Sequence, residues 1–334
     1  MTGLKIFSPY RAELEDKSGL SAPEQNRSGW NESSGDHLAE RRQAVVQSSA
    51  QPRPLVSGAA SARWEATSTG HPRLHLHRRF RSGFLPDDRD IVVYLPPGYD
   101  DHPSHHYPVL YLQDGQNLFD PATSFVAGRT WQVREAADAA IAAGEVEPLI
   151  IVGIYNTGDR RLAEYTPVAD WRMGGGEAAS YGLLLTRELM PWMAQQYRLR
   201  GDRASTGLGG SSLGGLVSLY LGLEYAHLFG RLAILSPSVW WSRRNILAFV
   251  HQRAEQMDER PRIWLDAGDH EGRMTLRDAE SLARRLFKEG WRDDETLHFE
   301  RVYGGTHDEA SWAQRVRPML RFLFPGEHVD IANR

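Results

Sequence analysis

The sequence contains no cysteine among its 334 residues. This absence excludes disulfide bonds, cysteine metal ligands and a thiol nucleophile, so any covalent catalysis must use another side chain. The chain also lacks a basic segment followed by an apolar core of the kind that directs export. No apolar run approaches the roughly 18 residues that a membrane span needs. We therefore expect a cytoplasmic protein that does not act at a membrane.

The chain has little excess charge, because 39 Lys and Arg face 43 Asp and Glu and leave a formal net charge of -4. This balance gives no electrostatic reason to expect nucleic acid as a partner. His75 and His77 would share one face of a strand, but no carboxylate accompanies them in a clear geometric relation. We expect no metal and no cofactor, and the sequence leaves the oligomeric state open.

The composition divides the chain near residue 65. Residues 1–65 are rich in Ser, Arg, Gln, Gly and Pro and show no sustained apolar period, which predicts a disordered polar tail. Residues 66–328 are long enough for one large domain, and 329–334 form a short C-terminal tail.

Short apolar runs and helical patterns alternate through this domain. The predicted strands are 90–99, 107–115, 148–156, 204–210, 231–238, 262–268 and 297–305. The predicted helices are 131–144, 177–197, 213–226, 276–290 and 308–324. The alternation predicts an α/β fold with a mostly parallel, doubly wound sheet and helices on both faces. The first two strands, which no helix separates, are expected to be antiparallel.

The glycine-rich run GLGGSSLGGLVSLY, residues 207–220, has three possible interpretations. A phosphate-binding loop would need a lysine after its last glycine, but Gly214 is followed by Gly215. A dinucleotide fingerprint that starts at Gly207 and Gly209 would need its third glycine where Ser212 stands. Both ligand-binding interpretations therefore fail, and a packing device or a nucleophile turn is left.

The pattern G-x-S-x-G does match this run, from Gly210 to Gly214, with Ser212 at its centre. If Ser211 were central, the closing glycine would fall on Leu213. The motif joins a predicted strand to a predicted helix, which is the context of a nucleophile elbow. The alternative is a glycine-rich helix start that only packs against the sheet.

A catalytic serine needs a base and an acid on loops after later strands. His307 follows the last predicted strand and is the candidate base. The preceding strand is followed by Asp269 and Glu271, and the spacing alone does not choose between them. Asp266 falls within that strand and is expected to be structural.

An oxyanion hole needs two backbone amides that point at the developing negative charge. The residue after the nucleophile, Leu213, supplies one amide. The loop QDGQNLF after an early strand supplies the other, from Gly115 or Gln116.

Eight motifs occur in an order that closely resembles the putative esterase family of α/β-hydrolases. They are VYLPPGYD, YPVLYLQDGQNLFD, IIVGIYN, RLAEYTP, GGSSLGGLVSLY, LSPSVWW, LDAGDHEG and YGGTHDEASW. That family includes enterochelin (siderophore) esterases, feruloyl esterases and related carboxylesterases. The resemblance runs from about residue 72 to 325. It implies an α/β-hydrolase fold.

The resemblance implies a role for each residue of the motifs. Ser212 would be the nucleophile and His307 the base. The family's acid stands three residues after the glycine that ends its strand, which favours Glu271, counted from Gly268, over Asp269. The resemblance also implies that no metal is needed.

The resemblance further implies the surroundings of the reaction centre. It supports Gln116 or Gly115 as the second oxyanion donor. It places Trp240 and Trp241 at the substrate cleft, with packing as the alternative. It brings Arg161 near the site, where an ion pair that braces its own loop is the alternative.

The sequence thus predicts serine-dependent hydrolysis of a small-molecule carboxylic ester through an acyl-enzyme. Transfer of the acyl group to an alcohol, or a binding protein on the same fold without catalysis, are the alternatives. The family's siderophore branch often carries an N-terminal β-sandwich, and the polar residues 1–65 do not resemble one. The sequence does not identify the acyl and alcohol groups, which could be those of a siderophore, a phenolic or a generic ester.

Overall fold

The computed structural model describes residues 67–68 and 70–326. The predicted tail, residues 1–65, and the C-terminal residues 329–334 lie outside the described residues. The division of the chain near residue 65 therefore stays a prediction.

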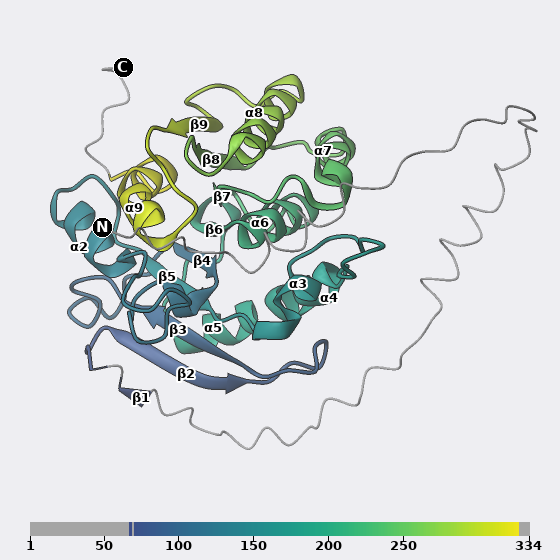
Figure 1. Ribbon diagram of the computed structural model, residues 1–334. Helices are drawn as coiled ribbons and strands as arrows, with labels where there is room; N and C mark the ends of the chain where they lie inside the picture. Colours follow the sequence, from purple (N-terminus) through teal and green to yellow (C-terminus); the bar gives the residue numbers. More distant parts are fainter. Residues whose placement is uncertain (1–66, 69, 327–334) are drawn as a thin grey trace, which may run out of the picture. The chain divides into compact units, whose positions relative to one another are not determined.

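One nine-stranded sheet organises the described residues (Figure 1). In spatial order its strands are β1 (Thr67–Ser68), β2 (Leu74–Phe80), β3 (Arg89–Tyr94), β5 (Ile150–Ile154), β4 (Val109–Gln113), β6 (Thr206–Ser211), β7 (Arg231–Leu235), β8 (Arg262–Gly268) and β9 (Leu297–Val302). The pairings from β5 to β9 are parallel, and those among β1, β2, β3 and β5 are antiparallel. The predicted α/β sheet, mostly parallel with antiparallel N-terminal strands, is confirmed.

The first two predicted strands are not neighbours, because β5 lies between β3 and β4. It pairs antiparallel with β3 and parallel with β4. Every residue of β5 is buried, as a strand covered on both faces and both edges requires. β3 and β4 therefore run in opposite directions, as expected, without touching as a pair.

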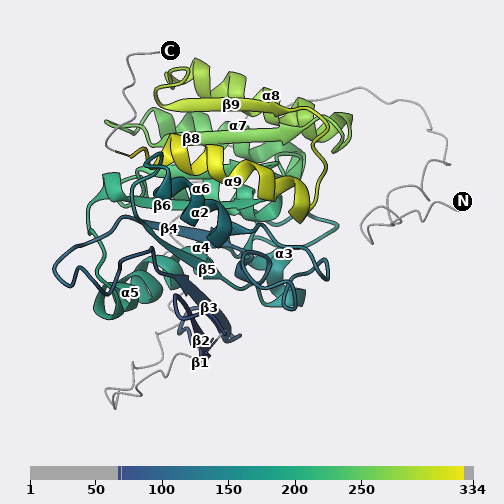
Figure 2. The ribbon, with the colours of Figure 1, turned by 90° about the vertical axis from the view of Figure 1, so that its left-hand side faces the viewer.

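Helices cover both faces of the sheet. One face carries α2 (Val133–Ala142) and α9 (Glu309–Leu323), which lie in front of the strands in Figure 2. The other carries α4 (Ala178–Leu183), the π-helical η3 (Leu184–Leu189), α5 (Met190–Gln196), α6 (Leu213–Glu224), α7 (Trp241–Ala254) and α8 (Arg273–Lys288). Short helical turns, η1 (Gly115–Asn117), η2 (Gly158–Arg160), α3 (Arg161–Glu164) and η4 (Arg203–Ser205), sit in the loops.

Helix α7 is an element that the sequence patterns did not indicate. Just after its first residue, Ser242, Arg243 and Arg244 have positive φ angles, so the chain makes a left-handed turn before the regular helix. No apolar period marks this start.

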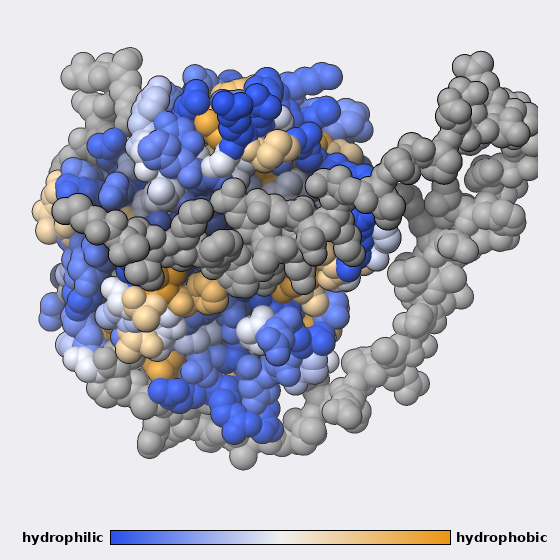
Figure 3. Space-filling view, in the orientation of Figure 1, coloured by the Kyte–Doolittle hydropathy of each residue, from blue (hydrophilic) through white to orange (hydrophobic). Residues whose placement is uncertain are grey.

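The surface of the described residues is mainly hydrophilic on the face drawn in Figure 3, where hydrophobic residues form separate patches. No helix among the described residues is long and apolar enough to cross a membrane. The carboxyl ends of the parallel strands β4 to β9 meet along one edge, where an open α/β sheet places its ligand-binding loops.

Candidate active site

A strained turn at Ser212 joins β6 to α6. Ser212 has φ 56° and ψ -121°, a conformation that a residue with a side chain rarely adopts. Its amide donates to the Leu235 carbonyl of β7 at 3.0 Å, which holds the turn against the neighbouring strand. The turn is sharp and strained, as a strand-to-helix elbow requires, and the role of Ser212 as a nucleophile stays a prediction.

The glycines around Ser212 give this turn the room it needs. A Cβ at Gly210 would lie 2.9 Å from the Gln113 Cβ and from the Gly214 backbone. A Cβ at Gly214 would lie 3.0 Å from the Gln113 Cβ and 3.1 Å from Asp114 Oδ2. The elbow therefore packs directly on the end of β4.

The two adjacent serines occupy different environments. Ser211 is the last residue of β6, is paired with Leu235 and is buried. Ser212 Oγ instead lies 3.3 Å from Ser238 Oγ, on the loop after β7. Within the described chain, no hydrogen bond joins Ser212 to His307.

His307 and Glu271 form a hydrogen-bonded pair, with 2.9 Å between His307 Nδ1 and Glu271 Oε2. The Glu271 side chain is fully buried, while the imidazole is 38% exposed. The loops meet because Gly268 and Gly305 approach so closely that a Cβ at Gly268 would lie 2.2 Å from the Gly305 carbonyl oxygen.

Asp269, the alternative acid, points elsewhere. Its Oδ1 accepts a hydrogen bond from the Gly304 amide at 2.8 Å, in an exposed setting. Of the two carboxylates, only Glu271 contacts His307 in the described structure.

The second oxygen of Glu271 is fully engaged. Oε1 accepts hydrogen bonds from Ser236 Oγ at 2.6 Å, the Gly268 amide at 2.8 Å and Arg315 Nη2 at 3.0 Å. Burial alone would raise the pKa of Glu271, but the hydrogen bonds from His307 and Ser236 and the nearby charge of Arg315 outweigh it. The net pKa is lower than usual, so the carboxylate stays ionised at neutral pH.

The predicted oxyanion loop follows β4 directly. Asp114 has a left-handed φ of 57°, and the chain then turns through η1, which begins at Gly115 and contains Gln116. In the described residues, neither the Leu213 amide nor the Gln116 amide donates to another protein atom. Both amides are therefore available as donors beside the elbow.

A comparison with known protein families identifies the family of the chain. The family model described as "Putative esterase" matches residues 82–323. The chain belongs to the putative esterase family.

Relatives of this esterase include an uncharacterised Bacillus subtilis protein, YbbA, 27% identical over 71% of this chain and 93% of the relative. An iron(III) enterobactin esterase of Dickeya dadantii is 25% identical over 76% of this chain. The alignment covers only 56% of that relative, so the chain spans about half its length. The family and its esterase-named members support ester hydrolysis as the activity.

Solved structures share the α/β-hydrolase fold. An IroE-like serine hydrolase from Shewanella oneidensis aligns with a TM-score of 0.62 and 23% identity, over 75% of this chain and 80% of that one. The BES protein from Bacillus cereus aligns with a TM-score of 0.63 and 22% identity, over 78% of this chain and 98% of that one.

Arg161 of the esterase contacts the oxyanion loop. Its guanidinium makes two hydrogen bonds to the Asp114 carboxylate, both 2.8 Å, and it stacks over the Tyr165 ring. Glu164, which follows on the same loop, is bound within the core by Arg89 at 3.0 Å. Arg161 thus braces the loop that precedes η1.

The two tryptophans after β7 have different environments. Trp240 is 45% exposed and free to meet a ligand. Trp241 is 2% exposed, and its indole N–H donates to the Val168 carbonyl at 2.8 Å. The position of Trp241 is therefore one of packing, while Trp240 remains the candidate for substrate contact.

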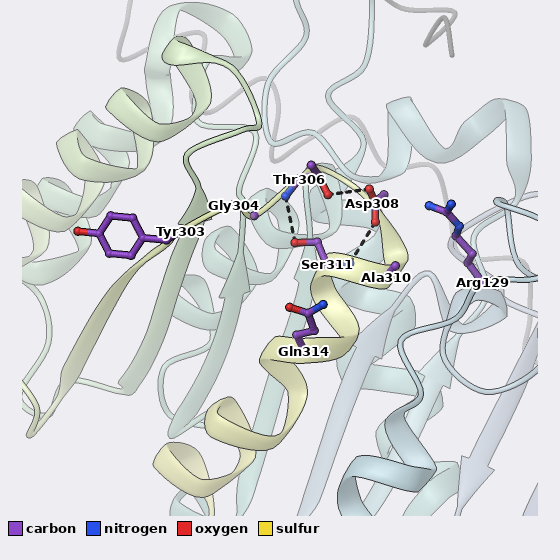
Figure 4. Close-up of a pocket in the computed structure, with 9 residues that line it drawn as sticks. Arg129, Tyr303, Gly304, Thr306, Asp308, Ala310, Ser311 and Gln314 are labelled. Carbon is purple, nitrogen blue, oxygen red and sulfur yellow. Dashed lines mark hydrogen bonds between the residues drawn. The ribbon is translucent and has the colours of Figure 1, made fainter. Parts of the chain in front are cut away.

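A shallow cavity of about 230 Å³ flanks the His307 loop (Figure 4). Its lining residues are Arg129, Tyr303, Gly304, Gly305, Thr306, Asp308, Ala310, Ser311 and Gln314. The Thr306 hydroxyl and the Ser311 amide both donate to the Asp308 carboxylate, and the Thr306 amide donates to the Ser311 hydroxyl. These bonds fix the residues on both sides of His307.

The histidine pair of β2 has protein partners. His75 Nδ1 and His77 Nε2 lie 3.2 and 2.6 Å from the Tyr197 hydroxyl. Burial and the neighbouring His75 lower the pKa of His77 to about 4. The described residues contain no cluster of three or more side chains that could hold a metal ion.

Several residues of the site were missed in the sequence, namely Ser236, Trp312 and Arg315 around Glu271, and Ser238 beside Ser212. The repeated serine in SPS at the end of a strand was an available signal, because that edge of the sheet carries the site. No signal marked Arg315, which lies on α9 two turns beyond His307.

Proposed function

We propose that this esterase cleaves carboxylic esters of small molecules through a covalent acyl-enzyme on Ser212. The observation that carries the proposal is the strained backbone of Ser212. This conformation costs energy that a turn with only a packing role would not need, and it is typical of a nucleophile elbow. The buried Glu271 and the partly exposed His307 supply the acid and the base.

The reaction has two halves. Ser212 Oγ attacks the acyl carbonyl while His307 Nε2 takes the hydroxyl proton, and the amides of Leu213 and Gln116 stabilise the oxyanion. The bond between the acyl carbon and the alcohol oxygen then breaks, His307 returns the proton to the leaving alcohol, and the acyl group stays on Ser212. Water, deprotonated by His307, then attacks the acyl carbonyl, the bond between this carbon and Ser212 Oγ breaks, and His307 returns the proton to Oγ as the acid leaves.

Glu271 holds His307 through Nδ1, which leaves Nε2 free for the hydroxyl. The ionised carboxylate also stabilises the imidazolium that forms in each half of the reaction. The Ser212 hydroxyl must turn from Ser238 toward the imidazole, and such contacts often tighten only when substrate binds. Trp240 is the proposed contact for the substrate's apolar part.

The test compares Ser212→Ala with Ser211→Ala on a p-nitrophenyl ester panel of varied acyl length and aromaticity. We expect the first change to lower kcat by at least about a thousandfold and the second to lower it only a few-fold. A fluorophosphonate probe should label the peptide that contains Ser212, as read by mass spectrometry. Unlabelled Ser212 together with near-normal turnover by Ser212→Ala would refute the proposal.

A further inference from the structure

Arg315 presents a puzzle for the proposed reaction. It lies 3.0 Å from the carboxylate that should stabilise the His307 imidazolium, and its positive charge opposes that stabilisation. The side chain is only 2% exposed, so water does not screen the effect. A buried cation is costly unless a charge of opposite sign compensates it.

The counter-charge is Asp266 of β8. Its Oδ1 lies 2.8 Å from Arg315 Nη1, and its Oδ2 accepts a hydrogen bond from the Trp264 indole at 2.7 Å. The Asp266 side chain is fully buried. Arg315 is thus held between two buried carboxylates, and its charge is shared between them.

The two terminal nitrogens of Arg315 also bind the framework of the site, whereas its buried Nε has no hydrogen-bond partner among the described residues. Nη1 donates to Ser236 Oγ at 2.8 Å, and Nη2 donates to the Thr306 carbonyl at 3.2 Å and to Ser311 Oγ at 2.8 Å. Thr306 directly precedes His307. One guanidinium therefore connects the strand of Asp266, the loop of Glu271 and the loop of the proposed base.

Ser236 completes the orientation of Glu271. Its hydroxyl accepts hydrogen bonds from Arg315 and from the Trp312 indole at 3.1 Å, which directs its own proton to Glu271 Oε1. With Oε1 so occupied, only Oε2 is left for the imidazole. Trp312 also packs edge-on against the His307 ring, with 5.0 Å between ring centroids.

We propose that Arg315 is a positioning residue that fixes Glu271, and that Asp266 offsets its charge so that Glu271 stays effective toward His307. The expected effect of Arg315 on turnover rests on the proposed function. The proposal adds that a chain of alternating charges leads from Asp266 through Arg315 and Glu271 to the His307 imidazole.

Other titratable residues lie close to this chain of charges, and the test must leave them unchanged. Asp308 caps α9 and Glu309 is its first residue, both beside His307, and Asp114 follows β4 near Glu309. His298 of β9 stacks on Trp264, with 4.5 Å between ring centroids. Burial raises the pKa of Asp266 to about 6, so this carboxyl is ionised at neutral pH but titrates below it.

The test uses variants of opposite charge effect, Arg315→Met and Asp266→Asn, in the full chain. Without the cation, Glu271 stabilises the imidazolium more strongly, so the acidic limb of the kcat/KM pH profile should move up, by at most about one pH unit because Asp266 without its partner more readily takes up a proton. Loss of Asp266 leaves the cation uncompensated, so the limb should move down by a similar amount. If the two substitutions only damaged the structure, both would lower kcat/KM, and the acidic limb of its pH profile would not move in opposite directions in the two variants.

Three further variants separate charge from geometry and from folding. Arg315→Lys keeps the charge but not the fork, so the limb should stay within about 0.3 pH unit while kcat falls ~10- to 100-fold. The double variant Arg315→Met with Asp266→Asn removes both charges and should return the limb toward its original pH. Arg317→Met removes an α9 cation that pairs with Glu145 at the surface, and should change neither value.

The pKa of the His307 imidazole, measured by NMR with His307→Gln to assign its signal, gives the same answer without turnover. Opposite shifts in the two single variants support the proposal, and unchanged or parallel shifts overturn it. If Ser212→Ala abolishes turnover but the acidic limbs of the Arg315 and Asp266 variants do not move, the esterase mechanism is supported and the proposed role of Arg315 is wrong. If no ester is cleaved, the NMR shifts still decide the role of Arg315 separately.

Discussion

Replacing Glu271 with Gln tests the proposed acid with little change in shape. Glutamine keeps the size of the side chain and an oxygen for the bonds from Ser236, Gly268 and Arg315. It removes the negative charge 2.9 Å from the His307 ring nitrogen. The loss should appear where the imidazolium forms, which is in the transition state and not in substrate binding.

The structure allows the size of the effect to be worked out. Unit charges about 4 Å apart at an effective dielectric constant of about 20 interact by about 4 kcal/mol. The imidazole is 38% exposed and Arg315 draws part of the carboxylate charge, so we discount this to roughly 3 kcal/mol. Since about 1.4 kcal/mol is a factor of ten, kcat should fall about a hundredfold, with KM little changed.

The matched control is Asp269→Asn, which removes a carboxylate two residues away that binds only the Gly304 amide. Its kcat should stay within about threefold of the original, since surface changes of this kind usually cost little. The assay is steady-state hydrolysis of one p-nitrophenyl ester by all three proteins at pH 8. A larger loss for Asp269→Asn, or a loss below about fivefold for Glu271→Gln, would refute the assignment of the acid.

Four further changes probe the elbow, the buried charge and the two tryptophans after β7. Gly214→Ala places a Cβ 3.0 Å from the Gln113 Cβ, which pushes the elbow from the oxyanion loop, so kcat should fall ~10- to 100-fold in steady-state assays. Asp266 has a pKa raised by burial from 3.8 to about 6, so its contribution to stability is present below pH 3.8 and is lost as the pH rises through 6. Urea unfolding should therefore show Asp266→Asn gaining about 3 kcal/mol relative to the original protein between pH 4 and pH 8, and an unchanged difference would contradict the burial of an ionised Asp266. Trp240→Ala should raise KM for aromatic esters with little change in melting temperature, whereas Trp241→Ala should cost about 3–5 kcal/mol of stability because it empties a packed position.

The elbow was predictable because its requirements are local. A strand, a serine and glycines at fixed offsets from it define the turn within a few residues, and the structure has Ser212 at a positive φ there. The choice between Asp269 and Glu271 was not local. It depends on how closely Gly268 approaches Gly305, a contact between loops 37 residues apart along the chain, which spacing on one loop does not contain.

The support behind the acid was harder to foresee for the same reason. Arg315 and Asp266 are 49 residues apart, and each alone resembles an ordinary residue of a helix or a strand. Their pairing follows from α9 packing across β7 and β8. The order of β3, β5 and β4 likewise depends on which edge each strand takes, which periodicity does not specify.

The tripeptide Ser236–Ser238 at the end of β7 connects the two halves of the proposed mechanism. β7 lies between β6, which ends at the elbow, and β8, which leads to Glu271. Ser236 Oγ donates to Glu271 on one side, while the Ser238 amide donates to the Ser212 carbonyl and Ser238 Oγ contacts Ser212 Oγ on the other. Pro237 separates the two serines and fixes one backbone angle between these anchors. Bringing Ser212 Oγ to His307 therefore requires rotation of side chains on a fixed frame, which is the preorganisation that a fast acyl transfer needs.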